Sequence, residues 1–282
     1  MNRREAILTF AGLFAQLSFG KIKMEKSKKM PVMFIGHGSP MNAIEDNDYT
    51  KTLVRLGKDL PKPRAILMIS AHWETNGTWL TSADQLKTIH DFYGFPKELY
   101  QIQYSAPGNK GLAFDLNSKG IGKLDDGKWG LDHGSWSILK HMYPEANIPV
   151  IQLSLDMTKP LSHHYELGQK IKELREHGVL IIGSGNVVHN LKELNWSANA
   201  SSHDWARDFD LWVKENLKKR DFEALVKRPF ESEVGKRSHP SIEHYLPLLY
   251  VIGASDSSDN LKFDYEGIQN ASISMLSVRF ES

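Results

Sequence analysis

The sequence feature that most constrains the fold is a run of apolar residues, 32–36, that leads into a histidine held between two glycines. Such a short apolar run is typical of a buried β-strand, and Pro40 stops regular structure soon after it. His37 is therefore predicted to lie at the carboxyl end of a strand. In open α/β sheets, ligands bind at this end of the strands.

Similar arrangements recur along the chain. Residues 65–71 form a second apolar run that ends at His72, and residues 179–182 form a third that enters a glycine-rich turn before His189. His244 comes just before an apolar segment that is predicted to be a buried helix. A lone histidine at a strand end is more often a hydrogen-bonded structural residue than a ligand. Four such histidines favour a metal site, although their spacing is not that of a local metal-binding motif.

The strand pattern also predicts the fold class. Residues 148–155 are mainly apolar, as expected for a strand in a parallel sheet covered on both faces. Residues 161–177 form the clearest amphipathic helix, and the chain closes with strand-like segments at 261–265 and 273–280. We expect an α/β fold, a single domain with a mostly parallel central sheet flanked by helices, whose active site lies at the strand carboxyl ends. Two domains are the alternative.

The first residues differ from the rest of the chain. Arg3 and Arg4 precede an apolar run, 6–19, and a lysine-rich stretch follows it. This order resembles a twin-arginine export leader, and an amphipathic extension of the domain is the alternative. We expect a leader or extension over residues 1–29 and a folded domain over 30–282. The protein is then cytoplasmic or, if the leader is used, exported to the periplasm.

Charge and cysteine content narrow the function. The chain has 35 Lys and Arg against 34 Asp and Glu, so its net charge of +1 favours neither nucleic acid nor a membrane as partner. A small-molecule substrate fits better, and no oligomeric state is predicted. Because the chain has no cysteine, nitrogen and oxygen ligands must hold any metal, and the 12 histidines supply ample nitrogen.

Two further segments carry functional residue types. Residues 90–96 combine three aromatic side chains with glycine and proline, which is typical of a pocket wall for a planar ligand or of a loop pinned to the core. Asp132 and His133 precede a predicted helix over 135–142, whose amino end favours anionic oxygen. Five other histidines are interpreted as solvated surface residues: His141, His163, His164, His177 and His203.

Six ordered blocks of sequence resemble a known family. The blocks are Gly36–Met41, Ser70–Trp73, His90–Pro96, Gly130–Trp136, Gly185–Leu191 and Glu243–Leu249. They closely resemble the DOPA-type extradiol aromatic ring-opening dioxygenases, which are class III extradiol enzymes related to the catalytic subunit of protocatechuate 4,5-dioxygenase. The resemblance runs from about Pro31 to Phe280.

The resemblance implies a mononuclear non-haem iron or zinc site. It carries metal binding over to four histidines: His37, His72, His189 and His244. It carries a catalytic role over to His133 and His189, so that His189 is either a ligand or a base near the metal. Dioxygenases commonly use two histidines and one carboxylate, and Glu243 is therefore an alternative ligand. The expected substrate-binding residues are Phe92, Tyr93, Asp132, His133 and Trp136.

The implied activity is insertion of both atoms of O2 into a small catechol, with DOPA as a candidate that is cleaved at the 4,5 bond to a seco semialdehyde. We expect Fe(II) to be required for activity, because Zn²⁺ is redox-inert. Zn²⁺ binds nitrogen sites more tightly and is expected to occupy the site as purified.

Two other function classes remain open from the sequence. A zinc-dependent hydrolase would use the same histidines to activate water, and a non-catalytic metal-binding protein could share the fold. A serine hydrolase is a weaker alternative, because Ser39 and Ser184 both lack the glycines of the G-x-S-x-G elbow.

Overall fold

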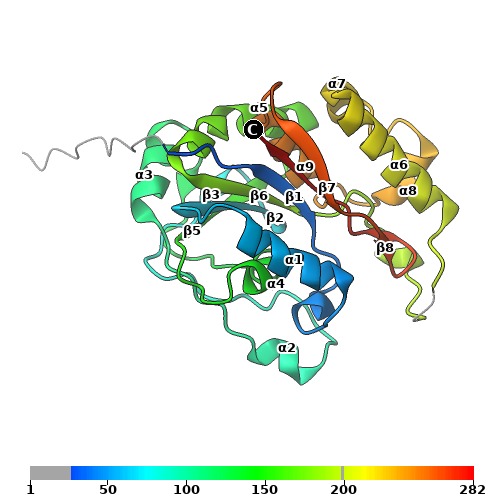
Figure 1. Ribbon diagram of the computed structural model, residues 1–282, viewed down its shortest axis with the longest axis horizontal. Coiled ribbons are helices and arrows are strands. Elements are labelled where there is room, and N and C mark those ends of the chain that lie inside the picture. The colour runs from blue at the N-terminus through cyan, green and yellow to red at the C-terminus, as the bar shows by residue number, and fades with distance from the viewer. Residues whose placement is uncertain (1–26, 198–199) are drawn as a thin grey trace, which may run out of the picture.

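The computed structural model describes the whole chain except residues 1–26 and 198–199 (Figure 1). Almost all of the expected leader therefore lies outside the described residues. The first described contacts already tie the chain to the domain, since the Ser27 amide donates to the Glu176 carbonyl at 2.8 Å. Lys29 forms ion pairs with two aspartates. A domain start near residue 30 stays a prediction.

One eight-stranded sheet forms the centre of the molecule, in the order β4-β3-β5-β2-β6-β1-β10-β7. The four central strands are parallel: β5 (Val150–Asp156), β2 (Ala65–Thr75), β6 (Val179–Gly185) and β1 (Val32–Gly36). The outer strands are β4 (Lys123–Leu124) and β3 (Trp79–Leu80) at one edge, and antiparallel β10 (Ser277–Glu281) and β7 (Asn260–Tyr265) at the other. The predicted single α/β domain with a mostly parallel sheet is confirmed.

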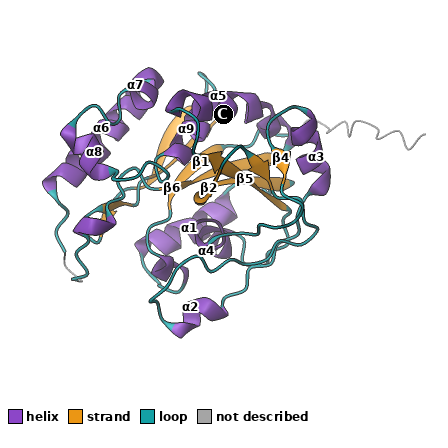
Figure 2. Cartoon of the chain, turned by 180° about the vertical axis from the view of Figure 1, so that it is seen from behind, coloured by secondary structure: helices purple, strands orange, loops and turns teal. Residues whose placement is uncertain are grey.

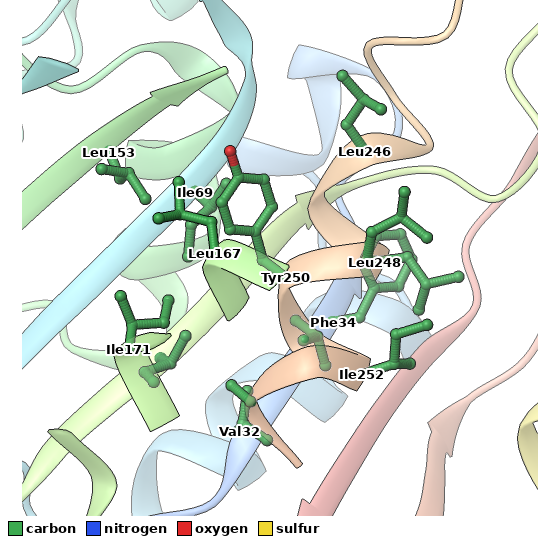
Figure 3. Packing of buried hydrophobic residues seen from close by; sticks show 14 of the residues in the cluster. Val32, Phe34, Ile69, Leu153, Leu167, Ile171, Leu246, Leu248, Tyr250 and Ile252 are labelled. Carbon is green, nitrogen blue, oxygen red and sulfur yellow. The ribbon is translucent and has the colours of Figure 1, made fainter. Parts of the chain in front are cut away.

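Helices cover both faces of the sheet, as the apolar strands require. Helices α1 (Asp48–Asp59) and α4 (His133–Met142) lie on one face, and α5 (Leu161–Ile171) and α9 (Leu246–Ala254) lie on the other (Figure 2). Side chains of β1 alternate between these layers, with Met33 packed toward α1 and α4 and Phe34 toward α5 and α9. Figure 3 shows Phe34 beside Leu248 of α9. Each residue of β1 is therefore buried whichever way its side chain points.

The remaining helices complete the molecule. They are α2 (Lys97–Gln101), α3 (Lys110–Ser118), α6 (Asp204–Lys219), α7 (Phe222–Lys227) and α8 (Glu233–Ser238). Short 3-10 turns occur at η1 (Pro40–Ala43), η2 (Lys172–His177) and η3 (Leu191–Glu193), and a separate two-stranded sheet pairs β8 (Ile268–Gln269) with β9 (Ile273–Ser274). Helices α6, α7 and α8 form an additional layer at the right of Figure 1. Among the described residues, no helix is both long and apolar enough to cross a bilayer.

Three sequence predictions need correction. The helix predicted over 161–177 is α5 followed by η2, and the strand predicted over 273–280 is divided into β9 and β10. His164 is not a solvated surface residue, because it is fully buried and its Nδ1 lies 3.0 Å from the Tyr250 hydroxyl. Its place on α5 faces α9, where packing outweighs the preference of histidine for water.

A buried ionic cluster lies at the amino end of the central strands. The Arg175 guanidinium forms an ion pair of 2.6 Å with Asp259. It also donates hydrogen bonds to the carbonyls of Met30, Ala254 and Phe280, at 2.8, 2.9 and 3.3 Å. The side chains of Arg175 and Asp259 are completely buried. This cluster joins segments from the beginning, the middle and the end of the domain.

Candidate metal centre

Five histidines converge at the carboxyl ends of the parallel strands. They are His37 after β1, His72 within β2, His133 at the start of α4, His189 after β6, and His244 before α9. The Nε2 atoms of His37 and His72 are 3.1 Å apart. The His244 ring lies 5.2 Å from that of His37 and 5.0 Å from that of His72, measured between centroids. The structure thus brings together all the histidines that the sequence singled out as functional.

Local backbone features aim two of these side chains. The pairing of β2 with β5 shifts register between Ile69 and Glu74, and this irregularity brackets His72. Gly185 lets the chain before α9 approach β6 closely, because a Cβ at this position would lie only 2.2 Å from the His244 carbonyl oxygen. That carbonyl accepts a hydrogen bond from the Asn186 amide at 2.9 Å. The glycine at the end of β6 therefore serves close packing that holds His244 in place.

A serine fixes the protonation pattern of His37. The Ser184 hydroxyl lies 2.5 Å from the Gly134 carbonyl oxygen, which can only accept, so the hydroxyl donates there. The same oxygen lies 2.9 Å from His37 Nδ1 and is thus free to accept from an Nδ1–H group. In this neutral tautomer, Nε2 of His37 carries a lone pair directed at the site.

Carboxylates fix the protonation pattern of the His72 and His244 rings in the same way. Glu243 lies 2.9 Å from Nδ1 of His244, and Asp91 lies 3.3 Å from Nδ1 of His72. Both carboxylates favour a proton on Nδ1, which leaves Nε2 unprotonated. The Nε2 atom of His244 is buried and has no hydrogen-bond partner among the described residues. The unprotonated Nε2 atoms of His37 and His72 thus face each other, with the His244 ring about 5 Å from both rings. Possible metal-binding atoms lie within 4.8 Å of one another in His37, His72 and His133, and again in His189, Glu243 and His244.

This arrangement fits a metal ion. The facing lone pairs of His37 and His72 repel each other at 3.1 Å unless a cation or a proton lies between them. In tetrahedral sites with metal–nitrogen distances of about 2.0–2.1 Å, neighbouring ligand atoms lie roughly 3.4 Å apart, close to the distance seen here. Burial, followed by the charges of neighbouring histidines, keeps the pKa of His37, His72 and His244 well below the ordinary value. The neutral ring is the form that binds metal.

Asp91 is a site residue that the sequence reasoning missed. Its Oδ2 atom lies 3.0 Å from Nδ1 of His133 and contacts His72 as well, while its Oδ1 accepts from the His133 amide at 2.8 Å. Burial alone would raise the pKa of Asp91, but the hydrogen bond and charge of His133 outweigh it and lower this pKa to about 2. One carboxylate thus orients His72 of β2 and His133 of α4, which are far apart in sequence.

His189 is held differently from the other histidines. Its ring stacks on that of His244, with centroids 3.4 Å apart and planes 9° from parallel. It forms no side-chain hydrogen bond within the described part of the chain, although its amide donates to the Ser238 carbonyl at 2.9 Å. Burial, then the charges of His239 and His133, lower the pKa of His189 to about 3. The ring is neutral and its nitrogens are free.

A cavity of about 590 Å³ opens above the histidines. Phe92, Tyr93 and Phe95 line it, so the segment 90–96 does form a pocket wall. Tyr93 is 91% exposed at the rim. Ser39 also lines the cavity, where its side chain accepts from the Met41 amide and caps η1.

Two expected substrate-binding residues do not reach this cavity. Asp132 is completely buried behind His133, where it caps α4 and accepts from the Ser70 hydroxyl at 2.7 Å. Trp136 is also completely buried, and its Nε1 donates to the Ile89 carbonyl at 2.9 Å. Both expectations are wrong in the same way, because the helix that begins at His133 turns these two side chains toward the core. They support the pocket from behind.

The fold and the site define a metal-dependent enzyme of the α/β class whose centre is built from histidines. Comparison with known proteins makes this specific. Residues 31–281 match the family model described as the catalytic LigB subunit of aromatic ring-opening dioxygenase. The chain belongs to this family of metal-dependent dioxygenases, as the six sequence blocks implied.

Similar proteins agree with this membership. The chain is 47% identical over 260 residues to a protein of Escherichia coli K12 named 4,5-DOPA dioxygenase extradiol, covering 90% of this chain and 95% of that protein. A protein of the same name from Beta vulgaris is 38% identical over 257 residues, covering 88% and 96%. A crystal structure of an uncharacterized E. coli K12 protein superimposes with a TM-score of 0.78 at 43% identity, covering 89% of this chain and 99% of that one.

Proposed function

We propose that this chain is an extradiol dioxygenase that cleaves DOPA or a similar small catechol, inserting both atoms of O2 and yielding a seco semialdehyde. The names of its relatives support this substrate class. The observation that carries the proposal is the cluster of three imidazoles, His37, His72 and His244, whose rings lie about 5 Å from one another at the base of a cavity with aromatic walls. Such a site suits a planar ligand that binds a metal through two oxygens.

Three histidines are proposed as the metal ligands: His37, His72 and His244, each through Nε2. A bound Fe(II) ion would supply activation of the catechol and of O2, which redox-inert Zn²⁺ cannot supply. We expect Zn²⁺ to compete for the site during purification, because nitrogen sites bind it more tightly than Fe²⁺. Glu243 is proposed to orient His244 rather than to bind the metal, since its Oε1 faces Nδ1 of that ring.

The remaining two histidines are proposed to move protons. His189 lines the cavity, and no hydrogen bond from a described residue occupies its ring, so it suits the acceptor of a catechol proton. His133 lines the cavity, and the contact of its Nδ1 with Asp91 at 3.0 Å holds its ring in place, so it suits a proton donor or a hydrogen bond to substrate oxygen. Phe92 packs edge-on against His133 at 5.6 Å and limits how the substrate ring enters.

The proposal is tested by reconstitution. The protein is purified without oxygen, loaded with Fe(II), and mixed with a panel of catechols in air, while O2 uptake and the yellow ring-fission product are followed. We expect product with Fe(II) and none with Zn²⁺ alone. If no catechol in the panel gives product although the Fe(II) content is stoichiometric, the proposed function is wrong.

A further inference from the structure

Four charged side chains line the cavity besides its histidines: Glu74, Asp91, Lys192 and Glu243. Two of them are occupied, since Asp91 pairs with His133 and His72 while Glu243 pairs with His244. The other two, Glu74 and Lys192, form no side-chain hydrogen bond or ion pair with any residue that the structure describes. The cavity therefore presents one free anion and one free cation.

The backbone around Lys192 is firmly held. Turn η3 begins directly after His189 and Asn190, and the Asn190 side chain accepts from the Lys192 amide at 3.0 Å. The same side chain donates to the Arg237 carbonyl at 2.7 Å. The adjacent acid, Glu193, is bound by two hydrogen bonds from Arg237 at 2.8 and 2.6 Å. Since its neighbouring carboxylate is already paired, the Lys192 ammonium remains uncompensated at the cavity.

Glu74 comes from a different element. It lies near the end of β2, two residues beyond His72, where its backbone pairs in register with Leu155 of β5. The other acid that lines this part of the cavity, Glu243, accepts from Ser241 at 2.9 Å in addition to its contact with His244. Glu74 has no comparable partner within the described residues, so its carboxylate is available to a ligand.

We propose that Lys192 binds the carboxylate and Glu74 the ammonium of a catechol that carries an amino-acid side chain. The inference rests on the proposed ring-cleaving function and adds the residues that select the substrate. A catechol bound over the histidines would extend its side chain toward these two charges. A substrate that lacks either charge leaves a protein charge unpaired. Sites built to bind a polar group reject ligands without that group more strongly than apolar pockets reject a ligand of the wrong size.

The test compares four catechols that differ only in side-chain charge. DOPA carries both charges, dopamine only the ammonium, dihydroxyphenylpropionate only the carboxylate, and methylcatechol neither. The variants are Lys192→Met, Lys192→Arg and Glu74→Gln. Lys62→Met is the matched control, because Lys62 is an exposed lysine before β2 that does not line the cavity. Kinetics of the Fe(II) protein are paired with anaerobic titration calorimetry, in which binding occurs without turnover.

The two charge variants are expected to act on different substrates. Lys192→Met lowers kcat/KM for DOPA and dihydroxyphenylpropionate, relative to methylcatechol, by about tenfold or more, as expected for a hydrogen bond to a charged group, and mainly through KM. Glu74→Gln does the same for DOPA and dopamine. Lys192→Arg restores most of the first effect because it keeps the charge. Lys62→Met matches the wild type on all four substrates.

Failure of this inference is distinct from failure of the proposed function. If the wild type cleaves catechols but both variants lose activity equally on all four, or keep the wild-type ratios, the charge assignment is overturned while the dioxygenase stands. If the wild type cleaves none of the four, the dioxygenase is overturned. The anaerobic titration then still decides the assignment, by whether the preference for DOPA over dopamine disappears in Lys192→Met.

Discussion

The two ends of the central sheet carry buried polar clusters of opposite design. At the amino end, the Arg175 guanidinium makes four hydrogen bonds, and its partner Asp259 is fully paired. At the carboxyl end, His37, His72 and His244 are anchored through Nδ1, and Nε2 of His244 has no partner among the described residues. Buried polar groups in proteins are normally satisfied. The satisfied cluster serves stability, and the unsatisfied one is available for a ligand.

Substitutions at the two ends are expected to have different effects. Changes at the carboxyl end should remove activity, and changes at the amino end should lower stability. The largest effect is expected for His37→Ala, which removes a proposed metal ligand and should abolish bound metal and activity together. The free energy of unfolding of the metal-free protein should change by only about 1 kcal/mol, the usual cost of one substitution. Metal analysis, O2 uptake and urea unfolding measure the three quantities. Full metal content in this variant would contradict the ligand assignment.

Arg175→Met tests the opposite end. Removing one partner of a buried ion pair leaves the other charge uncompensated, and we expect a loss of about 3–5 kcal/mol in the free energy of unfolding. Metal content and kcat per folded molecule should stay near the wild type, because the cluster is separated from the histidines by the length of the strands. Lys62→Met again serves as the control for a lost positive charge. A loss of metal with unchanged stability would refute the division between the two ends.

Asp91→Asn tests how the histidines at the carboxyl end are oriented. The neutral amide cannot hold His72 and His133 as the carboxylate does, and such changes behind a metal ligand typically cost about 10–100-fold in affinity or activity. We expect turnover to fall within this range while the metal remains bound at saturating concentration. Metal titration and kcat at full loading separate the two contributions. Wild-type kcat at full loading would mean that the contact with His133 is not used in turnover.

The smallest effect is a pH dependence at the amino end. Burial would raise the pKa of Asp259, but hydrogen bonds from Arg175 and Lys29 outweigh it and lower this pKa to about 2. Since the folded-state pKa lies below the unfolded value of about 3.9, the stabilisation is present above pH 4 and is lost as pH falls toward 2.

Urea unfolding of Asp259→Asn measures this contribution. The variant is expected to be less stable than the wild type at pH 6, and the two stabilities should converge as the solution is acidified. A constant difference at all pH values would show that Asp259 stabilises the fold without titrating.

The fold was largely predictable because strand burial on both faces leaves a simple signal. The runs before His37 and His72 are almost entirely apolar, with Ser70 the one polar residue, and they form the parallel strands β1 and β2. The burial of His164 could not be predicted in this way. A polar side chain on an amphipathic helix can be buried when it forms a hydrogen bond with a tertiary partner, here Tyr250. That partner lies 86 residues away, and no local pattern reveals it.

The site was predictable in part, for the same reason. Histidines at strand ends could be found because β-strands place their ends together. Asp91 could not, because it reaches His133 from an irregular loop whose course depends on tertiary packing. Asp132 and Trp136 sit beside His133 in sequence, but the rotation of α4 buries them, and periodicity alone did not fix where the helix begins. Lys192 could not be predicted from the sequence, because what distinguishes it is its position at the cavity without a partner among the described residues, and this is a property of the tertiary structure.

The Arg175 cluster also has a consequence for engineering. Its guanidinium binds the carbonyls of Met30 and Phe280, so the chain just before β1 and the chain near the end of β10 meet at one side chain, at the opposite end of the central strands from the cavity. A short flexible linker can therefore be expected to connect the two ends, with new termini opened in an exposed turn such as the one at Gly120. A fusion partner attached after Ser282 would likewise leave the catechol entrance clear.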